Sequence, residues 1–255
     1  MKVVKVNFET KRGADFDAVW LTINSLLGAW RMNGQVVSRE FPTCRTKRGI
    51  EVYLNVPEST SLAKRYNSDY ANKNLGELRK YGANPEIRLI GDEPESASVC
   101  SCNETEAYVL FTTYISLESP IRCLACFGVV PLYTIPKTAD GEYHDIICWM
   151  SDYQSCDSLQ MNSSVGERWA TNQLSKVDSR LTVLGLSICR AIERVTEKPV
   201  YYYLYKYNGK SRKMEGQRKC PNCKGEWSLD EPLYGIFDFK CDKCQLVSNV
   251  AWDVR

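Results

Sequence analysis

The stretch CPNCKGEWSLDEPLYGIFDFKCDKC, residues 220–244, decides the fold of the C-terminal part of the chain. It begins and ends with two cysteines separated by two residues, and seventeen residues lie between these pairs. Each pair forms a tight turn that points two thiolates at one ion, and two such turns complete a tetrahedral site. We therefore predict a structural zinc ion held by Cys220, Cys223, Cys241 and Cys244.

The residues around this site predict a small β module, a zinc ribbon. Apolar residues between the cysteine pairs supply two short strands, among them Trp227, Leu229, Leu233, Ile236 and Phe237. A module of about forty residues cannot bury a stable core by itself, so the metal contributes folding energy. Four protein ligands close the site and leave no open position for chemistry. The alternative, a redox motif, is a single CxxC near a βαβ unit rather than two pairs.

A second group of cysteines lies in the middle of the chain. It comprises Cys100, Cys102, Cys123 and Cys126, with twenty residues between its two pairs. The CxC spacing of the first pair is tighter than usual, so two ordinary free thiols are the alternative. A glycine follows each second cysteine after one residue, Gly128 here and Gly225 in the ribbon. We expect these glycines to adopt positive φ and to let backbone amides face the sulfurs, which favours a second zinc ion.

The remaining sequence predicts helices and strands in alternation. The predicted strands cover residues 3–8, 50–56, 87–90, 107–115, 143–150 and 200–207. Asp15 or Asp17 caps a helix in the N-terminal part. Apolar residues from Leu174 to Val195 trace one face of a long helix, with Asp178 or Ser179 as its cap.

These elements place the chain in the α+β class. We expect a body of mixed sheet and helix over residues 1–207, with the β zinc ribbon appended at its C-terminus. The body divides into candidate subdomains 1–95 and 96–207, and the second carries a zinc knuckle near residues 100–126. Residues 208–255 form a basic linker and the ribbon.

Composition limits the function classes. The formal net charge is only +2, so the whole chain lacks the basic excess typical of a nucleic-acid-binding protein. No apolar run approaches the roughly 18 residues of a membrane span. The N-terminus has Lys2 and Lys5 without an apolar stretch behind them, which is unlike a signal peptide. Twelve cysteines with metal-type spacing indicate a reducing compartment, and we expect a cytoplasmic protein with no membrane partner.

No catalytic motif of a common enzyme class is present in the sequence. Asp145, Asp152 and Asp157 cluster around Trp149, but a solvated helix edge explains such a cluster more often than an acid–base site. The single histidine, His144, lacks a nucleophile partner in the sequence. We therefore expect no enzyme. An enzyme of unrecognised type is the second alternative, and a deep pocket joining these side chains would favour it.

A basic linker precedes the ribbon. Six basic residues and one acidic residue lie between 206 and 219, and the candidate binding residues are Lys210, Arg212, Lys213, Arg218 and Lys219. Tyrosines at 201–207 lie just before them, and basic groups beside aromatic rings suit single-stranded nucleic acid. A solvated linker beside tyrosines packed in a sheet is equally consistent. The ribbon itself carries six acidic and four basic residues, which disfavours phosphate binding at its surface.

Several segments resemble one bacterial family. They are SPIRCLACFGVVPLY (119–133), KPVYYYL (198–204), RKCPNC (218–223) and FKCDKCQLVSN (239–249). Together they resemble uncharacterised zinc-ribbon-containing proteins for which nucleic-acid binding has been suggested. The resemblance covers mainly the C-terminal half; the ribbon cysteines match position for position, as do Cys123 and Cys126. It also implies a role as an immunity protein beside a secreted toxin.

The function expected from the sequence is non-catalytic. We expect a zinc-binding protein that binds a macromolecule, with another protein as the leading partner and a neutralised toxin as one form of it. The closed metal site, the near-neutral charge and the aromatic content favour this hypothesis. Nucleic-acid binding through the linker is the first alternative.

Overall fold

The computed structural model describes residues 1–138 and 143–255. It contains two compact units. Unit 1 comprises residues 1–99, 117–119 and 128–144, and unit 2 comprises residues 100–116, 120–127 and 145–255. Helices accompany both sheets, so the α+β class expected from the sequence is confirmed.

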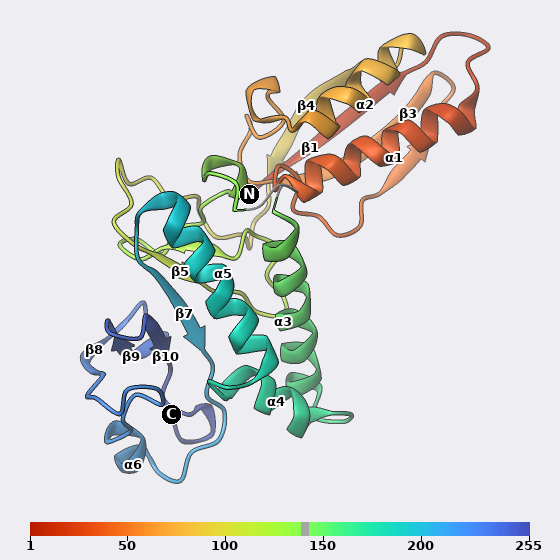
Figure 1. Ribbon diagram of the computed structural model, residues 1–255. Coiled ribbons are helices and arrows are strands. Elements are labelled where there is room, and N and C mark those ends of the chain that lie inside the picture. The colour runs from red at the N-terminus through yellow and green to blue at the C-terminus, as the bar shows by residue number, and fades with distance from the viewer. Residues whose placement is uncertain (139–142) are drawn as a thin grey trace. The chain divides into compact units, whose positions relative to one another are not determined.

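Unit 1 is built on a four-stranded antiparallel sheet with the order β2-β3-β1-β4. Its strands are β1 (Lys2–Glu9), β2 (Thr43–Arg45), β3 (Gly49–Val56) and β4 (Pro85–Asp92). Figure 1 shows α1 (Phe16–Met32) and α2 (Asp69–Lys80) side by side on one face of this sheet. Two 3-10 turns complete the unit, η1 (Lys64–Tyr66) and η2 (Leu132–Thr134).

The sequence of unit 1 explains this packing. Alternate residues of β1, Val4, Val6 and Phe8, are buried, because successive side chains of a strand point to opposite faces. The expected cap is confirmed at Asp15, whose carboxylate accepts from the backbone N–H groups of the next turn and satisfies donors that the helix leaves unpaired. Trp30 completes the buried layer between helix and sheet.

Unit 2 is built on a six-stranded mixed sheet with the order β6-β5-β7-β10-β9-β8. Its strands are β5 (Tyr108–Leu110), β6 (Ile121–Cys123), β7 (Val200–Leu204), β8 (Ser228–Leu233), β9 (Phe237–Cys241) and β10 (Leu246–Ser248). Its helical elements are α3 (His144–Asn162), α4 (Glu167–Ser175), α5 (Arg180–Thr196), α6 (Arg212–Gly216) and η3 (Trp252–Val254).

The C-terminal strands continue the sheet of unit 2. β10 pairs in parallel with β7, so that Leu246 lies opposite Tyr202 and Val247 opposite Tyr203. On its other side β7 pairs in parallel with β5. The ribbon expected from the sequence is therefore present with two strands between its cysteine pairs, and a strand of the body is its direct neighbour.

Two local predictions about unit 2 are wrong. The strand predicted over residues 143–150 is absent, and residues 144–150 form the first part of α3, because the apolar spacing of Ile146 and Trp149 continues through Tyr153 with a helical period. The long helix predicted from Leu174 is two helices, since α4 ends at Ser175 before the chain turns. Ser179 caps α5, as expected.

Two cysteines outside the clusters differ in their surroundings. Cys189 is buried on α5. Cys148 is exposed, because in a helix its side chain points away from the face that Trp149 presents to the sheet. Within the described residues, no helix combines the length and apolarity that crossing a membrane requires.

Candidate metal centres and an aromatic pocket

The C-terminal cysteines form a compact four-sulfur cluster. The sulfur atoms of Cys220, Cys223, Cys241 and Cys244 all lie within 4.8 Å of one another. The sulfurs of Cys223 and Cys241 are 3.6 Å apart. A tetrahedral ion with metal–sulfur bonds of about 2.3 Å requires sulfur–sulfur distances of about 3.8 Å, whereas a disulfide requires about 2.05 Å. The cluster therefore fits a thiolate-binding metal ion such as zinc.

The central cysteines form a second cluster of the same kind. The sulfurs of Cys100, Cys102, Cys123 and Cys126 also lie within 4.8 Å of one another. The sulfur of Cys102 is 4.0 Å from that of Cys123, and the sulfur of Cys100 is 3.5 Å from that of Cys126. The structure thus brings together the four residues that the sequence proposed as a second site, despite the tight CxC spacing.

All three CxxC turns share one backbone geometry. The residue directly after each second cysteine has positive φ: Phe127 at 58°, Lys224 at 61° and Gln245 at 51°. The backbone N–H of Phe127 donates to the carbonyl of Cys123 at 2.8 Å, and that of Lys224 to Cys220 at 3.0 Å. The central turn therefore repeats the ribbon turns, as in a metal knuckle.

The positive φ that we expected at Gly128 and Gly225 occurs one residue earlier in each turn. The left-handed conformation falls on Phe127 and Lys224, each directly before the glycine at which we expected it. Gly225 instead permits a close approach, because an added Cβ would lie 3.4 Å from the sulfur of Cys223. The backbone N–H of Gly225 accordingly faces that sulfur.

Ionisation differs among the sulfurs of each cluster. The N–H of Gly225 lowers the pKa of the Cys223 thiol to about 7. Burial opposes ionisation of Cys123, but N–H groups of Cys126 and Ala125 outweigh it and lower its pKa to about 7. Hydrogen bonds with the thiols of Cys126 and Cys100 raise the pKa of Cys102 to about 12. Four crowded sulfurs therefore do not ionise together without a cation, which a divalent metal supplies.

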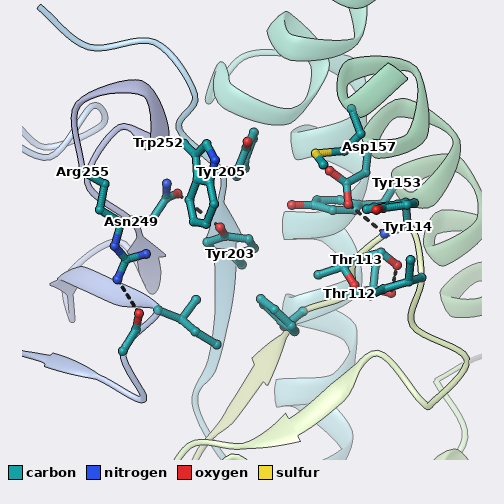
Figure 2. A pocket seen from close by; sticks show the side chains of 15 residues that line it. Thr112, Thr113, Tyr114, Tyr153, Asp157, Tyr203, Tyr205, Asn249, Trp252 and Arg255 are labelled. Carbon is teal, nitrogen blue, oxygen red and sulfur yellow. Dashed lines mark hydrogen bonds between the residues drawn. The ribbon is translucent and has the colours of Figure 1, made fainter. Parts of the chain in front are cut away.

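A separate aromatic pocket lies in unit 2, and Figure 2 shows it. Its volume is about 570 Å³. Five described segments form its wall: the chain after β5, the face of α3, the end of β7, the turn between β8 and β9, and the C-terminal residues after β10. Its lining includes the rings of Phe111, Tyr114, Tyr153, Tyr203, Tyr205 and Trp252. All the described residues that line it belong to unit 2.

One side of the pocket carries two polar groups from α3. Asp157, only 8% exposed, accepts from the backbone N–H of Tyr114 at 2.7 Å. Its other carboxylate oxygen has no hydrogen-bond partner within residues 1–138 and 143–255. Burial raises the pKa of Asp157, which the hydrogen bond from Tyr114 partly opposes. The hydroxyl of Tyr153 likewise lacks a partner among the described residues.

The opposite side comes from the C-terminal segment. The hydroxyl of Tyr203 donates to the amide oxygen of Asn249 at 3.2 Å, which fixes both side chains. The guanidinium of Arg255 donates to the carbonyl of Gly235 and lies near the ring of Trp252. Figure 2 shows Arg255, Asn249 and Trp252 facing Asp157 and Tyr153 across the pocket, with Tyr203 and Tyr205 between them.

The other candidate acid–base residues do not join this pocket. Of the acidic cluster singled out in the sequence, Asp157 alone lines it, whereas Asp145 and Asp152 are exposed elsewhere on α3. His144 is also exposed, at the start of the helix. Sequence reasoning marked Tyr205 only as one of a run of tyrosines, and it missed Trp252, because nothing in the local sequence of Trp252 marks it as a pocket residue.

The candidate residues of the basic linker separate into two groups. Arg218 is largely buried, where its guanidinium lies over the rings of Trp227 and Phe239 and donates to the carbonyl of Asn249 at 2.7 Å. It also forms an ion pair with Glu215 at 3.2 Å. Arg218 therefore stabilises the C-terminal module through internal contacts. It is poorly placed to bind phosphate, contrary to our expectation from the sequence that it is a nucleic-acid-binding residue.

The rest of the linker offers only part of the expected surface. Lys219 forms an ion pair with Glu226. The side chains that remain exposed without a recorded ion pair in the described part of the chain are Lys210, Arg212 and Lys213. All five residues of β7 are buried, so the rings of Tyr201 and Tyr202 are not free to stack on bases, whereas Tyr203 meets the pocket described above.

Three parts of the chain match protein families. Residues 1–91, 102–205 and 209–254 match families described as domains of unknown function, DUF8589, DUF2310 and DUF8594 in that order. None of these descriptions names a zinc ribbon.

An uncharacterised protein of Haemophilus influenzae is 35% identical over 236 residues, which cover 91% of this chain and 90% of that protein. The chain belongs to the same family as this protein. A second uncharacterised protein of that organism is 37% identical over 167 residues, which cover 66% of this chain and 82% of that protein.

Solved structures give only distant likenesses. A crystal structure of an antibiotic biosynthesis monooxygenase is similar over 37% of this chain and 100% of its own, with 12% identity and a TM-score of 0.30. Rv0793 from Mycobacterium tuberculosis is similar over 37% of this chain and 97% of its own, with 10% identity and a TM-score of 0.29. Neither likeness is close enough to bear on function.

Proposed function

We propose that this protein is a non-catalytic zinc-binding protein that acts by binding another protein at the aromatic pocket. One observation carries the proposal: large apolar side chains surround the pocket and remain exposed. Ile115 is 72% exposed and Trp252 is 58% exposed, and Tyr114 and Met161 are exposed beside them. Aromatic residues and methionine are enriched in protein interfaces, and an exposed apolar rim around a pocket is typical of a binding site.

The proposed zinc ions have a structural role. Each cluster supplies four cysteine sulfurs, the donor set typical of closed structural zinc sites. The ribbon cluster fixes the module that carries Asn249 and Trp252, and the structure places these two residues at the pocket. Metal binding at the ribbon therefore supports the shape of the binding site rather than any reaction.

The arrangement of the remaining groups supports binding rather than catalysis. Asp157 lies in the pocket without a histidine, lysine or second carboxylate among the described lining residues. An activated nucleophile requires an adjacent base within hydrogen-bond distance, and the described lining residues contain no such pair. The internal contacts of Arg218 and Lys219 reduce the support for nucleic-acid binding.

A capture experiment with matched variants tests the proposal. The tagged, zinc-loaded chain serves as bait in extracts of its native host, and captured proteins are identified by mass spectrometry and then tested as purified proteins. Ile115→Asp places a charge in the apolar rim. Leu21→Asp makes the same change at a site 68% exposed on α1, in unit 1.

We expect one protein to bind the wild type and Leu21→Asp, and to lose affinity by at least about tenfold with Ile115→Asp, as for an interface hot spot. A toxin neutralised by this chain is one partner of the proposed kind. Capture of RNA or DNA alone contradicts the proposal, and so does a partner whose affinity Ile115→Asp leaves unchanged.

A further inference from the structure

We propose that the pocket accepts the side-chain ammonium of a lysine from the protein partner, with Asp157 as its counter-ion. The inference rests on the proposed function, because it names the chemistry recognised at the same site. It is carried by the carboxylate of Asp157, which lies among aromatic rings inside the pocket, as Figure 2 shows, and whose second oxygen has no hydrogen-bond partner among the described residues.

The carboxylate of Asp157 is the first part of the argument. It is 8% exposed, and only the N–H of Tyr114 donates to it within the part of the chain that the structure describes. A carboxylate that burial removes from water remains costly until a cation or further donors satisfy it. A bound ammonium group supplies both the charge and the missing hydrogen bond.

The aromatic lining is the second part. Six rings line the pocket, and the faces of aromatic rings attract cations. Tyr153 lies beside Asp157 in Figure 2, and its hydroxyl, which has no hydrogen-bond partner among the described residues, can accept a second hydrogen bond from an ammonium group. The apolar walls suit the four-carbon stem of lysine, since such stems bury readily while the charged end finds polar partners.

The charges around the pocket set the direction in which the ligand enters. Asp157 supplies a carboxylate on one wall, and Arg255 supplies a guanidinium on the opposite wall, where it donates to the carbonyl of Gly235 and lies near Trp252. A lysine that reaches Asp157 with its ammonium group leaves its backbone carbonyl on the side of Arg255, which donates hydrogen bonds. The acidic excess of residues 220–255 further favours a basic partner segment.

A nucleobase is the competing occupant of an aromatic pocket. Base binding in nucleic acids depends on phosphate contacts from nearby lysine or arginine side chains. The exposed residues of the linker, Lys210, Arg212 and Lys213, do not line the pocket. Among the described residues that line the pocket, Arg255 is the single basic one, so the observations favour lysine.

The test uses small probes on the full-length, zinc-loaded chain. N-acetyl-lysine methylamide carries the ammonium group, N-acetyl-norleucine methylamide has a similar stem without the charge, and guanosine monophosphate supplies a base with a phosphate. NMR titration measures the affinity of each. Asp157→Asn keeps the acceptor for Tyr114 but removes the charge, and Asp152→Asn makes the same change on the exposed side of α3.

We expect the lysine probe to bind about tenfold or more tightly than the norleucine probe, as a paired ammonium in an aromatic site should. Asp157→Asn should remove this difference, with norleucine binding unchanged as evidence that the pocket is intact. Asp152→Asn should retain it. Equal binding of both probes, insensitivity to Asp157→Asn, or preferential binding of guanosine monophosphate overturns the inference.

The two proposals fail in different ways. If the captured partner depends on Ile115 but the lysine probe shows no preference, the docking function stands and the assigned chemistry is wrong. If the lysine probe depends on Asp157 but no protein partner depends on Ile115, the pocket chemistry stands and the docking function is wrong.

Discussion

Asp157 is the residue in which burial and charge conflict most directly. Burial raises its pKa above the ordinary value of 3.8, so the folded chain holds the proton more tightly than the unfolded chain. Its contribution to stability is therefore greatest below the ordinary pKa and is lost as the pH rises through the folded-state pKa. Asparagine at this position does not titrate, so its contribution to stability does not change with pH.

We predict that Asp157→Asn becomes more stable relative to the wild type as the pH rises from about 4 to about 7. Urea denaturation at each pH gives the difference in the free energy of unfolding, and subtraction removes the titration of other groups. Asp152→Asn is the matched control on the exposed side of α3 and should show no such trend. A difference that is constant with pH contradicts the assigned desolvation.

Gly185 on α5 packs so closely against Tyr202 and Trp149 that no side chain fits at this position. A Cβ there would overlap the ring of Tyr202 and lie 2.8 Å from Nε1 of Trp149. Because both rings are fully buried, we predict that Gly185→Ala lowers the free energy of unfolding by roughly 1–3 kcal/mol. Thermal and urea denaturation measure the change.

Gly28 provides the control of opposite sign for this substitution. It lies on an exposed face of α1, and a Cβ there meets nothing within 4 Å. Gly28→Ala should therefore stabilise the helix by about 0.5–1 kcal/mol. If Gly185→Ala also stabilises the protein, this result contradicts the close packing of α5 against β7 that the structure shows.

At the scale of residues, local spacing predicted which cysteines lie together but not the pocket. Cys220 and Cys223 needed only a tight turn to converge, and such a turn is encoded within four residues. Asp157, Tyr205 and Trp252 come from segments far apart in the chain, and only the sheet pairing of β7 with β10 brings them together. From the sequence alone, the tyrosines of β7 are equally consistent with a surface that stacks on bases and with a buried strand. The structure shows that they are buried.

At the scale of elements, Ser179 determines where α5 begins. Its hydroxyl accepts from the N–H of Thr182 and donates to the carbonyl of Gln173 at 2.6 Å, so it joins the end of α4 to the start of α5. We predict that Ser179→Ala lowers the free energy of unfolding by about 1 kcal/mol, as for other lost helix caps. Urea denaturation measures the loss.

Ser187 offers the matched control, because it lies exposed in the interior of the same helix. Alanine is the better helix former there, so Ser187→Ala should leave stability unchanged or raise it by a few tenths of a kcal/mol. Equal losses from the two substitutions would show that the cap is not what stabilises α5.

The elements that the sequence predicted best were those with a local start signal. Asp15 and Ser179 mark helix starts by their own side chains, and both predictions are confirmed. The start of α3 lacked such a signal, and the apolar run Ile146–Ile147 resembles a strand over a short window. Only the periodicity beyond residue 150 distinguishes the helix.

At the scale of the whole molecule, the sheet of unit 2 ties the ribbon to the body. β7 lies between β5 and β10, and Phe237 of the ribbon packs against Tyr203 with ring centroids 5.4 Å apart. Phe237 also meets Phe111 at 5.9 Å. The domain boundary that we expected near residue 208 therefore falls between two segments that share one sheet and one aromatic core.

We predict that a chain ending after Tyr207 does not fold stably. Loss of β10 leaves one edge of β7 unpaired and exposes the rings that Phe237 covers, a combination that favours aggregation. Size-exclusion chromatography and binding of a hydrophobic dye measure the outcome, with the full-length chain as the reference. A monomeric, dye-free chain of residues 1–207 contradicts the continuity of the sheet.

The metal content of the purified chain tests the central claim, that both cysteine clusters hold zinc. Elemental analysis of protein purified without chelator should give two zinc ions for each wild-type chain, one for each cluster. Cys126→Ser and Cys223→Ser should each retain about one, since each removes a ligand from a different cluster. A wild-type chain that holds one zinc ion or none, after purification without chelator, contradicts the account.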